Sequence, residues 1–115
     1  MTRDPEKFLF DMLDACRFLI EATAGASVQR YLSDRMFRGA VERELQIIGE
    51  AMLQLQRLAP ELAGNFTEHD RVIGFRHVLV HGYYDLDADL VWLIIKEKLP
   101  LLRAELEAAL PNEPP

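Results

Sequence analysis

The 115-residue sequence contains one cysteine, Cys16, and no long uninterrupted hydrophobic run. A single cysteine excludes an intramolecular disulfide and any metal cluster built on several thiolates. The most apolar window, residues 8–20, is interrupted by Asp11, Asp14 and Arg17, unlike a membrane span or a signal peptide. We therefore expect a cytoplasmic protein without membrane association, in which Cys16 is a small buried apolar residue.

Basic residues are also in deficit, since 13 lysines and arginines face 19 aspartates and glutamates and leave a net charge of −6. This balance argues against a nucleic-acid binder that works through a broad basic surface. The acidic excess lies in residues 41–69 and 86–115, whereas residues 1–40 and 70–85 are each balanced. A groove formed by the balanced segments could still bind RNA, with modest affinity.

Strand patterns, internal repeats and glycine-rich phosphate loops are missing from the sequence, and helical periodicity fills most of it. Pro5 suits the first turn of a helix that ends near Gly25, and this helix is apolar on two sides. Two apolar sides are expected either of a central bundle helix or of a helix at an oligomer interface. Asp34 or Ser33 is the expected N-cap of a longer helix that reaches about Ala59.

The longer helix repeats apolar residues at spacings of three and four, which is typical of a helix with one buried face. Gly49 inside it costs about 1 kcal/mol relative to alanine, a cost expected where a neighbouring helix crosses closely. Glu50 beside it either is solvated or faces a pocket through a partner such as Arg76. The apolar stripe consists of Phe37, Val41, Leu45, Ile48, Met52, Leu55 and Ala59.

A further helix is predicted for residues 68–81. Thr67 and Asp70 form a capping-box pattern at its start, and Gly82 is a typical helix stop. We expect this helix to be largely buried, because most of its apolar residues fall on one side of it. Those residues are Val72, Phe75, Val78 and Leu79, with Ile73 and Val80 beside them.

The last helical segment begins after Asp87, which is the expected N-cap, and Leu90 is expected to pack inward. Pro100 kinks or restarts this helix, because proline lacks an N–H and clashes with the preceding turn. The predicted fold class is all-α, an up-and-down bundle of four to five helices. We expect residues 1–110 to form one domain and residues 111–115 to be a disordered tail.

Arg76 and His81 are the candidates for catalysis. On a regular helix they lie about 140° and about 7.5 Å apart, so both can border one pocket if His81 occupies the last turn. RNA carries its own nucleophile, the 2′-OH, so a ribonuclease needs a proton acceptor and a cation that stabilises the phosphorane charge. Imidazole suits the first task and guanidinium the second. A purely structural alternative pairs Arg76 with an acidic neighbour and leaves His81 as a helix C-terminal residue favoured by the dipole.

His77 and His81 also form a His-x3-His pair, which places two imidazoles on one helix face at metal-ligand spacing. A third ligand would have to be His69, Asp70 or Glu50. We expect no metal here, because the sequence has no other cluster of histidines or cysteines.

Four stretches of the sequence resemble a known family. They are DRVIGFRHVLVHGYYD at residues 70–85, RELQIIGEA at 43–51, DLVW at 89–92 and LPLL at 99–102. Together they are similar to the HEPN ribonuclease superfamily and, within it, to the small HepT-like toxins of prokaryotic toxin–antitoxin pairs, over about residues 36–106. The resemblance implies a HEPN-like bundle, a homodimer, and a metal-independent endoribonuclease that needs no cofactor and leaves 2′,3′-cyclic phosphate and 5′-OH ends.

The resemblance also implies roles for single residues. Arg76 and His81 correspond to the catalytic pair, at a groove between two subunits, and we expect His77 and Glu50 to support that pocket. Tyr83 corresponds to the acceptor for AMP groups that a partner minimal nucleotidyltransferase, the antitoxin, attaches. A non-catalytic helical domain that binds nucleotide or the nucleotidyltransferase remains the second function class, although the presence of both Arg76 and His81 favours the ribonuclease.

Overall fold

The computed structural model describes residues 4–81 and 86–110, and all regular structure within these ranges is helical. The predicted all-α class is confirmed, and the predicted tail, 111–115, lies outside the described residues. In chain order the elements are α1 (Pro5–Thr23), α2 (Val28–Ser33), α3 (Arg35–Leu58), α4 (Pro60–Gly64), α5 (His69–His81), α6 (Ala88–Leu93), the π-helical turn η2 (Ile94–Lys98) and α7 (Leu99–Ala109).

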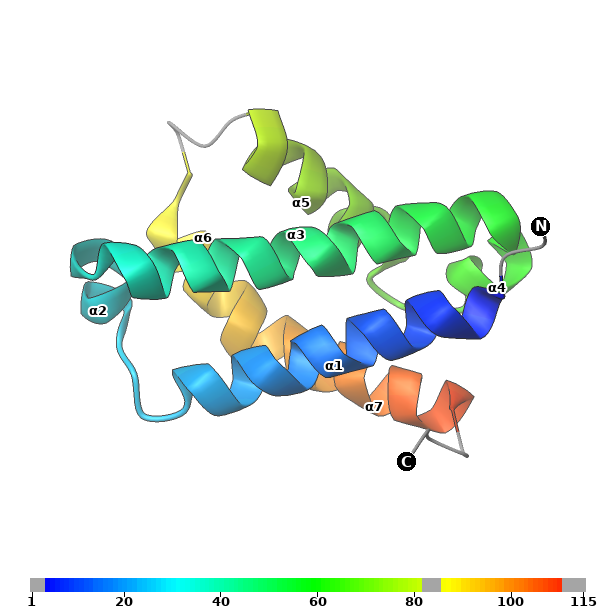
Figure 1. The fold of residues 1–115 in the computed structure, drawn as a ribbon, viewed down its shortest axis with the longest axis horizontal. Coiled ribbons are helices and arrows are strands. Elements are labelled where there is room, and N and C mark those ends of the chain that lie inside the picture. The colour runs from blue at the N-terminus through cyan, green and yellow to red at the C-terminus, as the bar shows by residue number, and fades with distance from the viewer. Residues whose placement is uncertain (1–3, 82–85, 111–115) are drawn as a thin grey trace.

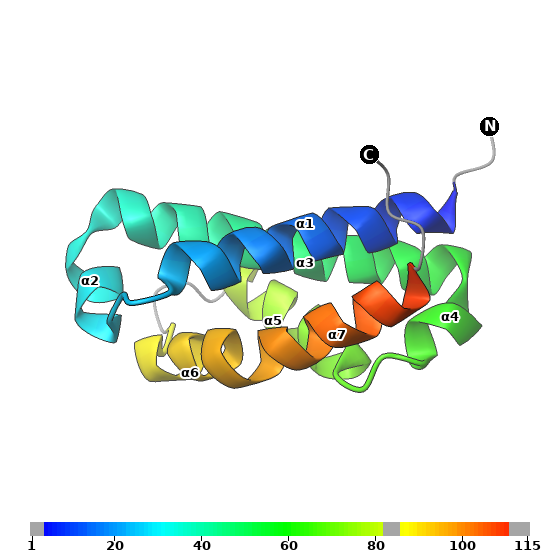
Figure 2. The same ribbon diagram turned by 90° about the horizontal axis from the view of Figure 1, so that it is seen from below.

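The helices form a bundle of two layers. Helices α1 and α3 lie side by side (Figure 1), and α5 and the α6–η2–α7 segment lie in a second layer beside them (Figure 2). Seen from below, α7 runs beneath α1 (Figure 2). Helix α5 packs mainly on α3, so α3 connects the bundle core with the helix that carries Arg76 and His81.

Both apolar sides of α1 are used within the chain, because α1 contacts α3 and α7. The central-bundle interpretation of this helix is therefore confirmed. Cys16 is fully buried, and burial raises the pKa of its thiol to about 12, so it stays protonated and unreactive at neutral pH. The buried residues of α1 are Leu9, Met12, Leu13, Ala15, Cys16, Leu19 and Thr23.

Local signals fix the ends of the helices. Asp34 is the N-cap of α3, and its side chain accepts a hydrogen bond from the amide of Phe37 at 3.1 Å. Asp87 caps α6 in the same way, accepting from the amide of Asp89 at 2.9 Å. Gly25 follows α1 with a φ of 75°, in the left-handed region that favours glycine. These boundaries confirm the ones predicted from the sequence.

Pro100 lies in the first turn of α7, directly after the π-helical turn η2. Its ring would clash with the carbonyl four residues earlier in a regular helix, and the wider turn before it relieves that clash. The predicted restart of the helix at Pro100 is confirmed. The chain keeps helical backbone from Ala88 to Ala109, with Ile95, Leu99, Leu102 and Leu106 buried against the core.

Helix α5 differs from the prediction, because none of its residues is fully buried. One flank packs on α3, and the other faces an open apolar groove that separates α5 from α6 and η2. Val78 is 41% exposed on the near side of this groove. Leu90, which we expected to pack inward, is 44% exposed on the far side. Apolar periodicity identified the apolar residues of α5, but it could not show that no helix among the described residues covers them on the side of the groove.

The predicted capping box at the start of α5 is also wrong. The Thr67 hydroxyl donates to Oε2 of Glu105 at 2.8 Å, so it is engaged with α7. The Asp70 carboxylate pairs with Nδ1 of His69 at 3.1 Å. A tertiary contact between residues 38 positions apart has thus replaced the local cap. None of the described helices is long and apolar enough to cross a membrane.

Candidate active site

Arg76 lies where α5 crosses α3 most closely. A Cβ atom added to Gly49 would lie 2.2 Å from the Cβ of Arg76 and 3.2 Å from its Cα. Because real Cβ atoms do not approach so closely, glycine is required here for the two backbones to meet. The close crossing predicted at Gly49 is confirmed, and it fixes where the Arg76 side chain leaves α5.

Glu50 anchors the Arg76 side chain. Nε of Arg76 is buried 2.8 Å from Oε2 of Glu50, but its N–H does not point at the carboxylate, so the contact is an ion pair rather than a linear hydrogen bond. Gln54 donates from Nε2 to Oε1 of Glu50 at 3.1 Å. The Gln54 amide and the Arg76 charge hold the pKa of Glu50 below its usual value, although partial burial opposes them. Of the two alternatives for Glu50, the structure therefore supports the pairing with Arg76.

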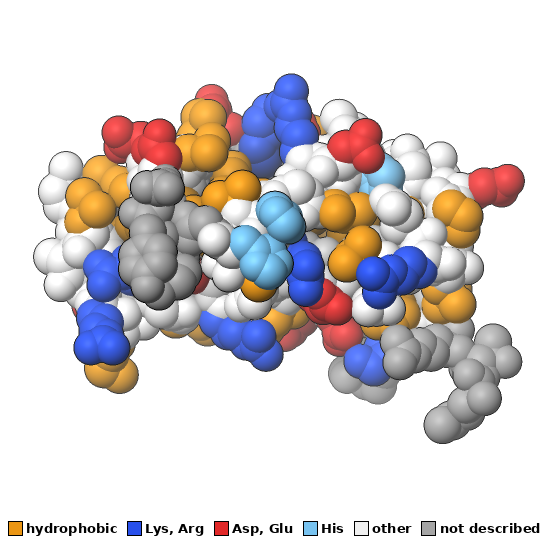
Figure 3. Space-filling view, turned by 90° about the horizontal axis from the view of Figure 1, so that it is seen from above, with side chains coloured by type: hydrophobic (Ala, Val, Ile, Leu, Met, Phe, Trp, Pro, Cys, Tyr) orange, Lys and Arg blue, Asp and Glu red, His pale blue; other side chains and the backbone are white. Residues whose placement is uncertain are grey.

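His77 and His81 lie together on the exposed side of α5. Their ring centroids are 4.6 Å apart, and the rings are inclined by 47°. The two neighbouring histidine side chains stand near the centre of the face seen in Figure 3, with basic side chains beside them. His81 is the last residue of α5, as predicted, so its imidazole is open to a ligand.

The structure thus arranges the predicted residues in two pairs, one between α5 and α3 and one on α5 alone. The Arg76–Glu50 pair faces α3, and the His77–His81 pair faces outward, as expected for positions about 140° apart. Tyr83 lies outside the described residues. No set of three histidine, cysteine, aspartate or glutamate side chains suited to a metal ion occurs within residues 4–81 and 86–110, and His69 contacts Oε1 of Gln56 at 2.6 Å instead.

A polar pocket of about 380 Å³ opens between α1, α3 and α5, next to the Arg76–Glu50 pair. Sequence reasoning missed this pocket and the contribution of Arg43, Gln46 and Gln54 to it. The signal was present, since these residues and Glu50 recur along α3 at spacings of three and four. The polar residues that line this polar pocket are Asp11, Arg43, Gln46, Glu50, Gln54 and Arg76.

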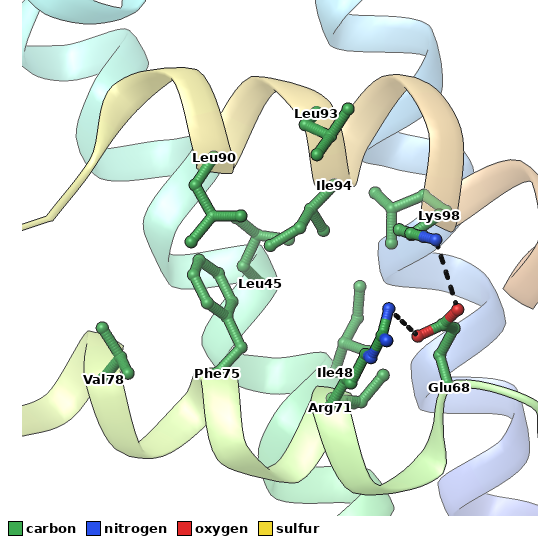
Figure 4. Close-up of a pocket in the computed structure, with 12 residues that line it drawn as sticks. Leu45, Ile48, Glu68, Arg71, Phe75, Val78, Leu90, Leu93, Ile94 and Lys98 are labelled. Carbon is green, nitrogen blue, oxygen red and sulfur yellow. Dashed lines mark ion pairs between the residues drawn. The ribbon is translucent and has the colours of Figure 1, made fainter.

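The apolar groove on the other flank of α5 has about 420 Å³ and different chemistry. Phe75 of α5 points across it toward Leu90 and Ile94 (Figure 4). At one end Glu68 pairs with Arg71 at 3.6 Å and with Lys98 at 3.4 Å. Acid–base groups suited to catalysis lie instead on the Arg76 and His81 side of the helix.

Comparison with known proteins shows the family of the chain. The family model described as "Ribonuclease HepT-like" matches residues 12–109. The protein named "Putative RNase MJ1380" of Methanocaldococcus jannaschii is 34% identical over 91% of this chain and 95% of its own length. The "Probable ribonuclease HepT" of Thermococcus cleftensis is 32% identical over 93% of this chain and 96% of its own.

No solved structure gives a significant match to the chain. The family model nevertheless spans α3, α5 and α6 in full, and with them Arg76, His81 and the Gly49–Glu50 crossing. With its histidine and arginine on one helix above a glycine crossing, the chain belongs to the HepT-like ribonuclease family, which makes it an endoribonuclease that acts on RNA.

Proposed function

We propose that the chain cleaves RNA without a metal ion, through attack of the 2′-OH on the adjacent phosphate. His81 accepts the 2′-OH proton, and Arg76 stabilises the charge of the phosphorane. A bond forms between the 2′-oxygen and phosphorus, and the bond to the 5′-oxygen breaks as this oxygen takes up the proton that His81 accepted, which leaves a 2′,3′-cyclic phosphate and a 5′-OH end. The observation that carries this proposal is the exposed imidazole of His81 on the same helix as a guanidinium anchored by Glu50.

Glu50 and His77 act as positioning residues in this proposal. Glu50 fixes the Nε edge of Arg76, and the arginine side chain retains 28% exposure for contact with a phosphate. His77 restricts the orientation of the neighbouring His81 ring. In both roles a neighbour holds a catalytic side chain in its working orientation before RNA binds. The side chain then needs little movement when charge develops on the phosphorane.

We also propose that the active form is a homodimer with two Arg76–His81 sets at a shared groove. Exposed apolar residues on both sides of the apolar groove, including Leu93 at 45% exposure, support a surface that a second copy covers. The rim of the apolar groove carries both signs of charge, because Glu68 lies there with Arg71 and Lys98. A surface with both signs of charge can be complementary to a second copy of itself.

The dimer should be visible by light scattering at micromolar concentration, as a mass twice the 13.2 kDa of the chain. Leu93→Asp places a charge in the apolar groove and should shift the protein toward monomer. Phe18→Asp is the matched control, because Phe18 is 47% exposed on α1, away from the groove. Dissociation by Phe18→Asp alone would move the interface to α1, and a wild-type monomer would exclude the dimer.

As for its biological role, we propose that the ribonuclease is the toxin of a two-gene module whose antitoxin is a minimal nucleotidyltransferase. The resemblance to HepT-like toxins supports this role. A non-catalytic nucleotide- or partner-binding domain is the competing function. A short nucleotidyltransferase gene beside this one would fit both functions, so the cleavage assay decides between them.

Tyr83→Phe should keep the ribonuclease active but prevent its silencing. An AMP group on Tyr83, two residues after His81, would place a phosphate near Arg76 and compete with the RNA phosphate. Incubation with the nucleotidyltransferase and ATP should add adenylate-sized mass to wild type and none to Tyr83→Phe. Tyr84→Phe is the matched control and should still be modified. Modification of Tyr83→Phe but not of Tyr84→Phe would transfer the acceptor role to Tyr84.

A further inference from the structure

Arg43 lies at the edge of the polar pocket. It is exposed on α3 and forms no ion pair among the described residues, although its charge opposes the effect of burial, which raises the pKa of the adjacent Glu44. Arg76, which lines the same pocket, is paired with Glu50. A guanidinium that lines a pocket outside any ion pair is available to bind an anion.

The local charge of the polar pocket differs from that of the whole protein. Its two carboxylates are already paired, Asp11 with Lys7 at 3.1 Å and Glu50 with Arg76 at 2.8 Å. The residues that line the pocket are two cations, Arg43 and Arg76, and two anions, Asp11 and Glu50, so the lining is neutral in a chain whose net charge is −6. Arg43 is therefore the group that makes this part of the surface attractive to a phosphate.

Arg43 and Arg76 reach the polar pocket at different heights along the axis of α3. Arg76 crosses α3 at Gly49, six residues after Arg43, which is about 9 Å along the helix axis. Because both side chains line the same pocket from backbone positions offset in this way, we expect them to contact two different phosphates of one strand rather than a single phosphate. The polar pocket thus extends the proposed catalytic site by one nucleotide.

The rest of the polar pocket suits a base. Phe8 and Ile47 line it and are only partly buried, so each leaves apolar surface for a base to cover. Gln46 adds an amide, which can both donate to and accept from a base edge. The volume of about 380 Å³ lies within the range of small-ligand sites, about 300–1,000 Å³.

We propose that the polar pocket binds the nucleotide next to the scissile phosphate of single-stranded RNA, with Arg43 on its phosphate and Gln46 on its base. This inference rests on the proposed ribonuclease function, because it is Arg76 that holds the scissile phosphate. Single-stranded RNA fits better than a duplex, since only an unpaired base can turn its edge and its face to a pocket.

Binding of a fluorescent 2′-O-methyl RNA oligonucleotide tests the role of Arg43. This RNA lacks the free 2′-OH and is not cleaved, so binding is measured separately from catalysis. The logarithm of the binding constant falls as the logarithm of the salt concentration rises. Removing one phosphate contact makes this negative slope shallower by about 0.7 for a single strand. Arg43→Gln should show this loss, whereas Arg103→Gln on α7, which does not line the polar pocket, should not. An unchanged slope in Arg43→Gln, or an equal loss in both variants, overturns the proposal.

Cleavage kinetics and competition complete the test. With cleavable RNA, Arg43→Gln should raise KM and leave kcat unchanged, because the contact is equal in the ground and transition states. Gln46→Ala should change the relative kcat/KM for substrates that differ in the base beside the cleavage site, and an unchanged preference would remove Gln46 from base recognition. Competition by AMP as strong as by the oligonucleotide would reassign the polar pocket to free nucleotides. Failure of wild type to cleave RNA would refute the catalytic proposal, while the salt slope of Arg43→Gln would still be measurable.

Discussion

His81→Ala should abolish RNA cleavage while the helix bundle stays folded. The side chain is exposed at the end of α5, so its removal leaves no cavity and should change the free energy of unfolding by no more than about 0.5 kcal/mol. A positioned proton-transfer group contributes about 10²–10⁴-fold to the rate, and the variant should lose at least that factor. The assay is cleavage of a labelled RNA in EDTA, with identification of the ends and circular dichroism of the variant.

His77→Ala is the matched control, since it removes another exposed imidazole from the same helix face. This variant should reduce the rate much less than His81→Ala, because the His77 side chain only orients the His81 imidazole and does not itself accept the proton. Arg76→Ala should be slower by about 10²–10³-fold, the usual effect of losing one stabilising group in the transition state. Persistent cleavage by His81→Ala, or a requirement for Zn²⁺ or Mg²⁺, would contradict the mechanism and favour a metal held by His77 and His81.

Features encoded by a few neighbouring residues were predictable from the sequence. Asp34 and Asp87 begin helices because a short acceptor side chain can bond the free amides of the first turn. Gly49 indicated a close crossing because glycine is otherwise unfavourable inside a helix. Pro100 indicated a restart because proline cannot continue a regular hydrogen-bond ladder. The predicted range of the helix that carries Arg76 and His81, residues 68–81, agrees with α5, although its predicted cap does not form.

Features that depend on the partner of a side chain were not predictable. Thr67 bonds Glu105 of α7, and no local pattern could favour that acceptor over the first turn of α5. Glu50 had two open interpretations until the helix crossing placed Arg76 over it. The polar stripe of α3 that includes Arg43 was visible in the sequence, but the polar pocket needs α1, α3 and α5 together, so the stripe alone could not show that these residues line a pocket.

Gly49→Ala should destabilise the protein, against the usual effect of this substitution in a helix. Alanine in place of glycine gains about 1 kcal/mol of helix propensity. The added methyl would meet the Cβ of Arg76 at 2.2 Å and its Cα at 3.2 Å, so no side-chain rotation relieves the overlap and α5 must move. Overpacking of this kind costs about 1–3 kcal/mol or more. We expect a net loss on the order of 1–2 kcal/mol in urea unfolding.

Gly39→Ala, on the same helix, provides the control. A Cβ at Gly39 meets nothing within 4 Å, so this variant should gain about 0.5–1 kcal/mol. The two substitutions share their chemistry and their helix, and they differ in what faces the new methyl group. Equal stability of the two variants would mean that α3 and α5 do not meet as closely as the structure shows.

Gly49→Ala should also reduce cleavage, because α5 carries both Arg76 and His81 while Glu50 stays on α3. Moving α5 away from α3 pulls Arg76 from its 2.8 Å contact with Glu50 and frees the guanidinium to rotate. A displacement of about 1 Å in a catalytic group can cost about 10²-fold in rate. Gly49→Ala should therefore lose activity at temperatures where it is still fully folded, with kcat falling more than KM rises. Full activity of the folded variant would show that the crossing at Gly49 supports the bundle alone, and that Arg76 does not need Glu50 to act.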